Sequence, residues 1–185
     1  RGIADSSFSG PTQSPVGHYF GDMRTGYHRP EPDLKLVDIA SVEILEGPQG
    51  TLYGSGALGG IVLLKPRMPV LDELGGSVAS GLSVTWHGDP GYDASSVLNL
   101  PIGGNAAVRA VGYRAREGGY IDNSATGERD INAIETAGGR AMLSAELIPG
   151  WFVDVGGAAQ RIDGDDSQYA DRHAPGLSRD SLVDQ

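Results

Sequence analysis

The sequence has 185 residues, a formal net charge of −10 and a pI of about 4.7, with 29 glycines, 6% aromatic residues and no cysteine. The acidity argues against a nucleic-acid-binding surface, and the absence of cysteine excludes disulfides and thiolate metal sites. No apolar run reaches the roughly 18 residues of a membrane helix, so contact with a bilayer would require β-structure.

Residues 1–33 are rich in proline, glycine and serine, and we expect them to be irregular apart from one apolar patch at 16–23. The chain begins with Arg1 and shows no signal-peptide pattern, which indicates a mature or interior piece. Four side chains here could face a ligand, although scattered His and Tyr in a polar loop are more often ordinary surface: His18, Tyr19, Tyr27 and His28.

Residues 38–66 read as strand, glycine-rich loop and strand. A β-prone run at 42–45 predicts the first strand, and a continuous run at 61–64 predicts the second. Pro48 and six glycines separate them: Gly47, Gly50, Gly54, Gly56, Gly59 and Gly60. Glycine at this density permits positive φ and close backbone approach, so we expect the loop to lie against another surface.

Three of these glycines also fit the dinucleotide fingerprint G-x-G-x-x-G: Gly54, Gly56 and Gly59. That fingerprint needs a strand immediately before it and a helix immediately after it. Here the β-prone run ends near Glu46 and strand-like residues follow. No Gly-Lys-Ser/Thr follows either, which excludes a P-loop. A soluble nucleotide-binding enzyme is therefore a remote alternative, as is a lid loop of an unrelated soluble β-protein.

After residue 72 the pattern changes to five strand-like runs, at 76–86, 92–100, 106–116, 139–147 and 151–160. In most of them apolar side chains alternate with small or polar ones, over about the length that a tilted strand needs to cross a bilayer. The third run cannot be oriented from the sequence, because Val108 and Val111 fall on opposite faces and Arg109 fits neither.

The connections between these runs are short at 87–91 and 101–105, long at 117–136, short at 148–150 and long after 162. Transmembrane barrels have short periplasmic turns and longer outer loops. If the first strand starts at the periplasm, 101–105 and 148–150 are periplasmic and the two long connections are outside. Trp86 and Trp151 then lie where an aromatic girdle would, with core packing as the alternative.

Two stretches resemble TonB-dependent outer-membrane receptors. Residues 14–23 and 32–66 resemble the end of their plug domain, through Val42, Glu43, Ile44, Gly47, Pro48, Leu52, Tyr53, Gly54, Gly59, Gly60 and Val62. Residues 99–123 resemble their second to third barrel strands. Two positions depart from the pattern: Glu46 stands where the family has a basic residue that pairs with barrel carboxylates, and Leu63 stands where a polar residue is common.

The resemblance implies a mainly β chain, with residues 1–72 as the later part of a plug domain and 73–185 as about the first five strands of an outer-membrane β-barrel. Five strands cannot close a barrel, for which about eight is the minimum, so we expect a segment of a longer receptor. The resemblance assigns a structural role inside the barrel to the plug motif, which comprises Glu43, Gly47, Pro48, Tyr53, Gly54, Gly59 and Gly60.

The implied function is TonB-dependent uptake of a scarce large solute, such as a siderophore, cobalamin or glycan, across the bacterial outer membrane. The implied partners are TonB, through a segment outside this chain, outer-membrane lipid and a solute that the sequence does not identify. A passive porin-like or adhesive outer-membrane β-protein is the alternative, and the plug motif argues against it.

The sequence shows no catalytic, cofactor or metal constellation, and we do not expect an enzyme. The four histidines are dispersed, at His18, His28, His87 and His173. Four aspartates could hold Ca²⁺ but lack the EF-hand order, so a solvated acidic outer loop is favoured: Asp163, Asp165, Asp166 and Asp171.

Overall fold

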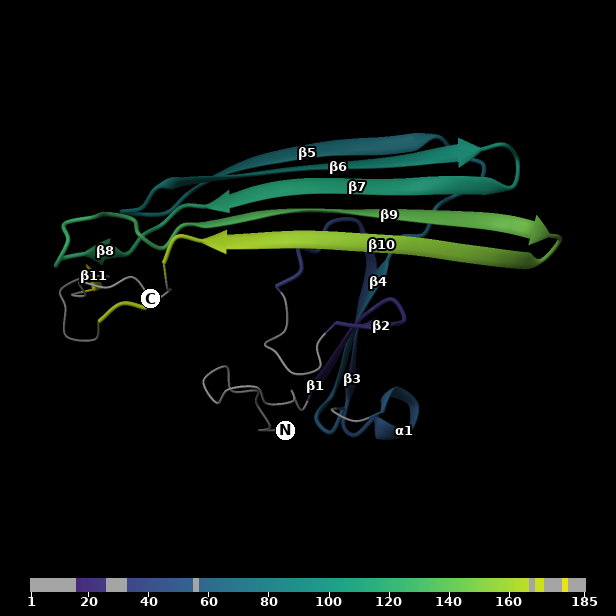
Figure 1. The fold of residues 1–185 in the computed structure, drawn as a ribbon, viewed down its shortest axis with the longest axis horizontal. Coiled ribbons are helices and arrows are strands. Elements are labelled where there is room, and N and C mark those ends of the chain that lie inside the picture. Colours follow the sequence, from purple (N-terminus) through teal and green to yellow (C-terminus); the bar gives the residue numbers. More distant parts are fainter. Residues whose placement is uncertain (1–15, 26–32, 55–56, 167–168, 172–177, 180–185) are drawn as a thin grey trace. The chain divides into compact units, whose positions relative to one another are not determined.

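The structure is a computed structural model that describes residues 16–25, 33–54, 57–166, 169–171 and 178–179. The chain divides into two compact units, Arg1–Arg67 and Met68–Gln185. Each unit is built around its own β-sheet (Figure 1). The point at which the plug domain of the whole protein ends, placed at residue 72 from the sequence, stays a prediction.

Among the described residues, no helix is both long and apolar enough to cross a membrane.

The first unit holds a four-stranded sheet in the order β2-β1-β4-β3, formed by β1 (Val16–Phe20), β2 (Met23–Arg24), β3 (Ile39–Glu46) and β4 (Gly60–Pro66). β4 pairs antiparallel with β3 and parallel with β1. The predicted strand, loop and strand at 38–66 is confirmed. The apolar patch at 16–23 lies in the hairpin of β1 and β2, where Gly21, with φ +58°, lets the chain reverse.

The glycine-rich loop of this unit contains one short helix, α1 (Gly50–Tyr53), which the sequence did not predict. Gln49 precedes α1 without a side-chain cap, so the usual signal for a helix start is absent. Tyr19, Ala57 and Ile61 form the buried core of the unit, and Tyr53 and Leu63 pack against it.

The second unit holds a five-stranded antiparallel sheet in the order β10-β9-β7-β6-β5. Its strands are β5 (Gly75–Val84), β6 (Pro90–Ile102), β7 (Ala106–Glu117), β9 (Ile134–Ile148) and β10 (Trp151–Gly164). All five predicted strands are confirmed. Within the described residues the sheet stays open, with β5 and β10 at its edges (Figure 1). The prediction of a mainly β chain with an unclosed barrel is therefore confirmed.

The largest differences from the predicted strand boundaries are at the start of β9 and the end of β10. β9 begins at Ile134, so the loop predicted at 117–136 ends earlier, and β10 continues to Gly164. Ile134 pairs with both Glu117 and Gly164. Backbone pairing on both sides of β9 thus continues through residues whose side chains do not alternate, and the sequence pattern cannot reveal this extension.

Strand register assigns each side chain to a face, because residues opposite one another in adjacent strands share a face. Arg109 lies opposite Asn99 and Met142, which settles the orientation of β7. The polar face carries Asp93, Ser95, Asn99, Arg109, Tyr113, Arg140, Ser144, Asp154 and Gln160. The apolar face carries Val78, Leu82, Val84, Leu98, Leu100, Val108, Leu143, Val153 and Val155.

The two ends of the sheet differ in their connections (Figure 1). The short turns that follow β6 and β9 lie at one end. The connection from β7 to β9 lies at the other end, together with β8 (Asp122–Asn123) and β11 (Ser178–Arg179), which pair in parallel. Trp86 and Trp151 are 87% and 71% exposed, so neither is packed in a core within this structure.

Candidate functional site

The plug motif closes its loop through glycine geometry. Gly47, Gly54 and Gly60 have φ values of +85°, +75° and +136°, in the region that disfavours other residues. A Cβ at Gly60 would overlap the carbonyl oxygen of Leu45. The amide of Gly47 donates to the carbonyl of Gly59 at 3.3 Å. These glycines bring the two ends of the loop onto the paired strands β3 and β4.

Tyr53 of the motif fixes α1 to the core of the first unit. Its ring meets the ring of Tyr19 edge-on, with 5.1 Å between centroids. The hydroxyl of Tyr19 donates to the carbonyl of Tyr53 at 2.7 Å. Tyr19, a candidate ligand-facing residue in the sequence, is therefore a buried core residue. His18 is half-buried in β1, and the other two candidates, at 27–28, lie outside the described residues.

The remaining motif residues lie on the surface of this unit. Glu43 pairs with Nζ of Lys65 at 2.7 Å, and both side chains are about half exposed. Pro48 is exposed, as is Glu46, the carboxylate that replaces the basic residue of the family pattern. Leu63, the other departure, packs against the core, which gives a physical reason for an apolar residue there.

The elements that flank the fingerprint G-x-G-x-x-G are not those of a nucleotide-binding loop. α1 ends at Tyr53, directly before them, and β4 begins at Gly60, directly after them. A phosphate-binding loop needs the reverse order, with a strand before and a helix after. This geometry removes the support for the nucleotide-binding alternative.

Asn132 organises the connection between β7 and β9. Its Oδ1 accepts hydrogen bonds from the amides of Tyr120 and Ile121 at 2.7 and 2.8 Å. The amide of Ile131 donates to the carbonyl of Ile121 at 2.9 Å. Asn132 and Ile121 are buried. The long connection is thus folded on itself through a buried amide, which the sequence prediction of a polar loop did not reveal.

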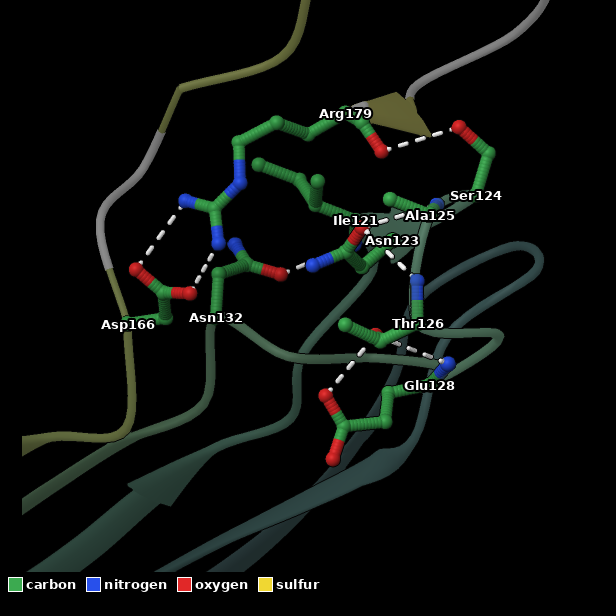
Figure 2. Close-up of polar contacts among 9 residues, drawn as sticks. All are labelled: Ile121, Asn123, Ser124, Ala125, Thr126, Glu128, Asn132, Asp166 and Arg179. Carbon is green, nitrogen blue, oxygen red and sulfur yellow. Dashed lines mark hydrogen bonds and ion pairs between the residues drawn. The ribbon is translucent and has the colours of Figure 1, made fainter. Parts of the chain in front are cut away.

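Ser124 joins this connection to the segment after β10, and Asn123 folds the connection on itself (Figure 2). Oδ1 of Asn123 accepts from the amides of Ala125 and Thr126 at 3.1 and 3.4 Å. The amide and the hydroxyl of Ser124 donate to the carbonyl of Arg179 at 2.8 and 3.1 Å. We call residues 118–133, 165–166 and 178–179 the outer-loop cluster.

A buried ion pair closes the outer-loop cluster (Figure 2). The guanidinium of Arg179 contacts both carboxylate oxygens of Asp166, with 3.0 Å from Nη1 to Oδ1. The two side chains are 4% and 5% exposed. A two-point contact of this kind is the geometry that compensates for burying both charges. The sequence offered no pairing between these residues.

The acidic residues considered for Ca²⁺ have other surroundings. Asp166 binds Arg179, and Asp163 accepts from Nε of Arg161 at 2.7 Å. Within the described part of the chain, no three side chains from His, Asp or Glu are placed to hold a metal ion.

Asp130, in the outer-loop cluster, is a titratable group whose pKa is shifted. Burial raises the pKa of its carboxyl, and the charges of Asp89 and Asp122 raise it further, while Arg129 lowers it. Its backbone is left-handed, with φ +55°, and no described residue donates a hydrogen bond to its buried Oδ1.

Comparison with known proteins identifies the family. Residues 8–61 match the family model described as the TonB-dependent Receptor Plug Domain. The pesticin receptors of Yersinia enterocolitica and Yersinia pestis are 34% identical to this chain over 112 residues. Residues 8–61 are therefore similar to the plug domain of TonB-dependent receptors. The match to the pesticin receptors covers 58% of this chain and 16% of each receptor, so the chain spans a small share of its relatives' length.

Solved structures of receptors have the same fold as this segment. The ferric yersiniabactin uptake receptor of Yersinia pestis superposes with a TM-score of 0.72 at 24% identity, over 89% of this chain and 25% of that one. The ferripyoverdine receptor of Pseudomonas aeruginosa gives 0.62 at 20% identity, over 78% and 18%. TonB-dependent receptors are proteins of the bacterial outer membrane, and the predicted localisation is confirmed. These relatives are receptors and transporters rather than enzymes.

Proposed function

We propose that the receptor containing this segment takes up a scarce large solute across the outer membrane with energy supplied through TonB. One observation carries the proposal: a plug-domain match at residues 8–61 precedes, in the same chain, antiparallel strands with one polar and one apolar face. A barrel with a polar inner face and an apolar outer face allows passive diffusion without a plug. The presence of a plug domain therefore favours energy-coupled uptake. TonB would act through a segment outside this chain.

The chemistry of the two sheet faces supports a barrel wall. Val78, Leu82 and Val84 are between 83% and 90% exposed on the apolar face, where lipid would cover them. The polar face carries charged and amide side chains suited to a wet interior or to contact with a plug. The sheet end with the outer-loop cluster would then face outward and the short turns would face the periplasm, as the connection lengths predict.

A ferric siderophore is the solute class that the relatives favour. The similar structures include receptors named for ferric yersiniabactin and ferripyoverdine, and this segment shares their fold. Cobalamin and glycans are the competing solutes. The plug motif has a structural role in this proposal, since its glycines close the loop and Tyr53 packs against the core.

Uptake of ⁵⁵Fe by cells that carry or lack the complete receptor gene tests the proposal, with ferric yersiniabactin and ferripyoverdine as probes and labelled cobalamin as a comparison. We expect receptor-dependent uptake of at least one ferric siderophore, and its loss when TonB is deleted. Uptake that persists without TonB would instead support the passive porin-like alternative. Uptake of cobalamin alone would overturn the siderophore assignment while leaving TonB coupling intact.

A further inference from the structure

The segment between β4 and β5 crosses from one unit to the other without regular structure of its own. Residues 67–74 belong to no helix or strand, and the second unit begins at Met68. Backbone amides and carbonyls of such a segment need partners other than a ladder. The partners of Val70 and Glu73 come from one side chain of β6, the strand next to the edge strand β5.

That side chain is Asn99, on the polar face of β6 and 3% exposed. The amide of Val70 donates to its Oδ1 at 2.9 Å. Its Nδ2 donates to the carbonyl of Val70 at 2.8 Å and to that of Glu73 at 2.6 Å. Asn99 thus satisfies both polar groups of Val70, as a neighbouring strand would, and uses both of its own donor hydrogens.

The attachment combines these hydrogen bonds with the burial of Pro69, which directly precedes Val70. Val70 is 41% exposed and Glu73 is exposed as well. A pocket of about 190 Å³ remains beside the contact, lined in part by Ser77, Val97 and Arg109 of the sheet. Most of the segment is exposed, whereas Pro69 is buried and Leu71 is half-buried, so its contact with the sheet is confined to the residues around Val70 and Glu73.

We propose that Asn99 is the anchor that fastens the plug-to-barrel segment to the wall, so that displacement of the plug stops at Val70. This inference rests on the proposed function. Force applied to the plug passes along the chain toward β5, whose first pair is Gly75 with Asn99 itself. Without the anchor, that force would pull on the end of the β5–β6 ladder and open it pair by pair. With the anchor, the three hydrogen bonds of Asn99 bear the force before it reaches the β5–β6 ladder.

Single introduced cysteines test the anchor in living cells, in a complete receptor from which any other cysteine has been removed by substitution. Met68→Cys reports on the chain before the anchor and Asp72→Cys on the chain after it; both positions are exposed. Labelling by a membrane-permeant maleimide is measured with and without a protonophore, in Asn99 and Asn99→Ala backgrounds. Asn105→Ala is the matched control, because Asn105 is an exposed amide that donates to the carbonyl of Glu146 at 3.1 Å.

We expect Asn99→Ala to raise labelling at Asp72→Cys about tenfold, the scale set by losing several hydrogen bonds, and Asn105→Ala to leave it unchanged. Unchanged labelling in Asn99→Ala overturns the anchor. Heat-modifiable migration on gels verifies that the barrel has assembled. If Asn99→Ala does not assemble, Asn99→Asp decides in the same way, since its carboxylate would face two carbonyl oxygens.

The energy dependence separates this inference from the proposed function. If labelling at Met68→Cys does not respond to the protonophore in any background, TonB-driven movement is contradicted. Increased labelling at Asp72→Cys in Asn99→Ala would still establish Asn99 as an attachment point. Both TonB-driven movement and the anchor are supported by the following pair of results. The protonophore lowers labelling at Met68→Cys in every background, and it lowers labelling at Asp72→Cys only in the Asn99→Ala background.

Discussion

Gly60 shows at the scale of one residue why the plug motif contains glycine at its last position. Its φ of +136° lies in a region that other residues avoid, and a Cβ there would overlap the carbonyl of Leu45. The sequence predicted glycine-dependent backbone approach in this loop. It could not tell which glycines approach a neighbouring backbone: Gly47 and Gly54 also have positive φ, but they have open space where a Cβ would stand.

Gly60→Ala is expected to destabilise the plug by roughly 1–3 kcal/mol, through backbone strain and displacement of β3. Gly50→Ala is the matched control, since Gly50 lies in α1 with open space around it and alanine favours a helix. Limited proteolysis of the purified complete receptor measures the difference. Equal cleavage rates in the two variants would contradict the assignment of strain to Gly60.

Asp130 gives a pH dependence whose sign follows from its surroundings. Burial, together with Asp89 and Asp122, raises the pKa of its carboxyl in the folded state. The native state therefore binds this proton more tightly than the unfolded chain does. The free energy of unfolding falls as pH rises from the ordinary aspartate pKa through the raised one, and this destabilisation is fully present above it.

Asp130→Asn removes that charge and suits the left-handed backbone at this position. We expect the outer-loop cluster of the variant to resist proteolysis better at pH 8 and to equal the parent below pH 4. Glu128→Gln, which removes a charge from an exposed position of the same connection, serves as the control and should change neither rate. An equal gain in resistance to proteolysis at both pH values would mean that the left-handed backbone at position 130, and not the charge, explains the effect.

At the scale of strands, the alternation of apolar and polar side chains predicted where the strands lie but predicted their ends less accurately. The five runs of the second unit were predictable because apolar side chains on one face alternate with polar or small ones. β9 and β10 extend further because each residue of 134–136 has a partner on both sides. α1 escaped prediction because a single turn flanked by glycines has no amphipathic pattern.

Adjacent residues of β5 test the assignment of the two faces. Val78 lies on the apolar face, opposite Ser96, and Ala79 lies on the polar face, opposite Ser95. Val78→Arg should reduce the assembled, heat-modifiable receptor in outer membranes, because arginine on the lipid face costs about 2–4 kcal/mol near the bilayer centre. Ala79→Arg should assemble nearly as the parent does. Equal loss in both variants would contradict the face assignment.

At the scale of the whole chain, the features that the sequence missed are contacts between distant segments. Asn99 forms hydrogen bonds with Val70, 29 positions away, and with Glu73, 26 positions away. Ser124 donates to Arg179, which is 55 positions away. Local periodicity carries no information about such pairs. The family was predictable because the plug motif is a local pattern. The anchor and the outer-loop cluster were not, because each requires the register of several strands to be known.

The ion pair of Asp166 and Arg179 makes the outer-loop cluster one body, and its removal should separate the cluster into two. Asp166→Asn leaves a buried guanidinium without its counter-charge, a change that in other proteins costs about 3–5 kcal/mol. We expect the amide of Ser124, which donates to the carbonyl of Arg179, to exchange its hydrogen much faster in this variant of the complete receptor. Asp163→Asn removes an exposed carboxylate, paired with Arg161, and should leave that exchange unchanged. Similar protection of the Ser124 amide from exchange in the parent and in Asp166→Asn would mean that β8 and β11 stay paired without the ion pair. The ion pair would then be a consequence of the loop structure and not its cause.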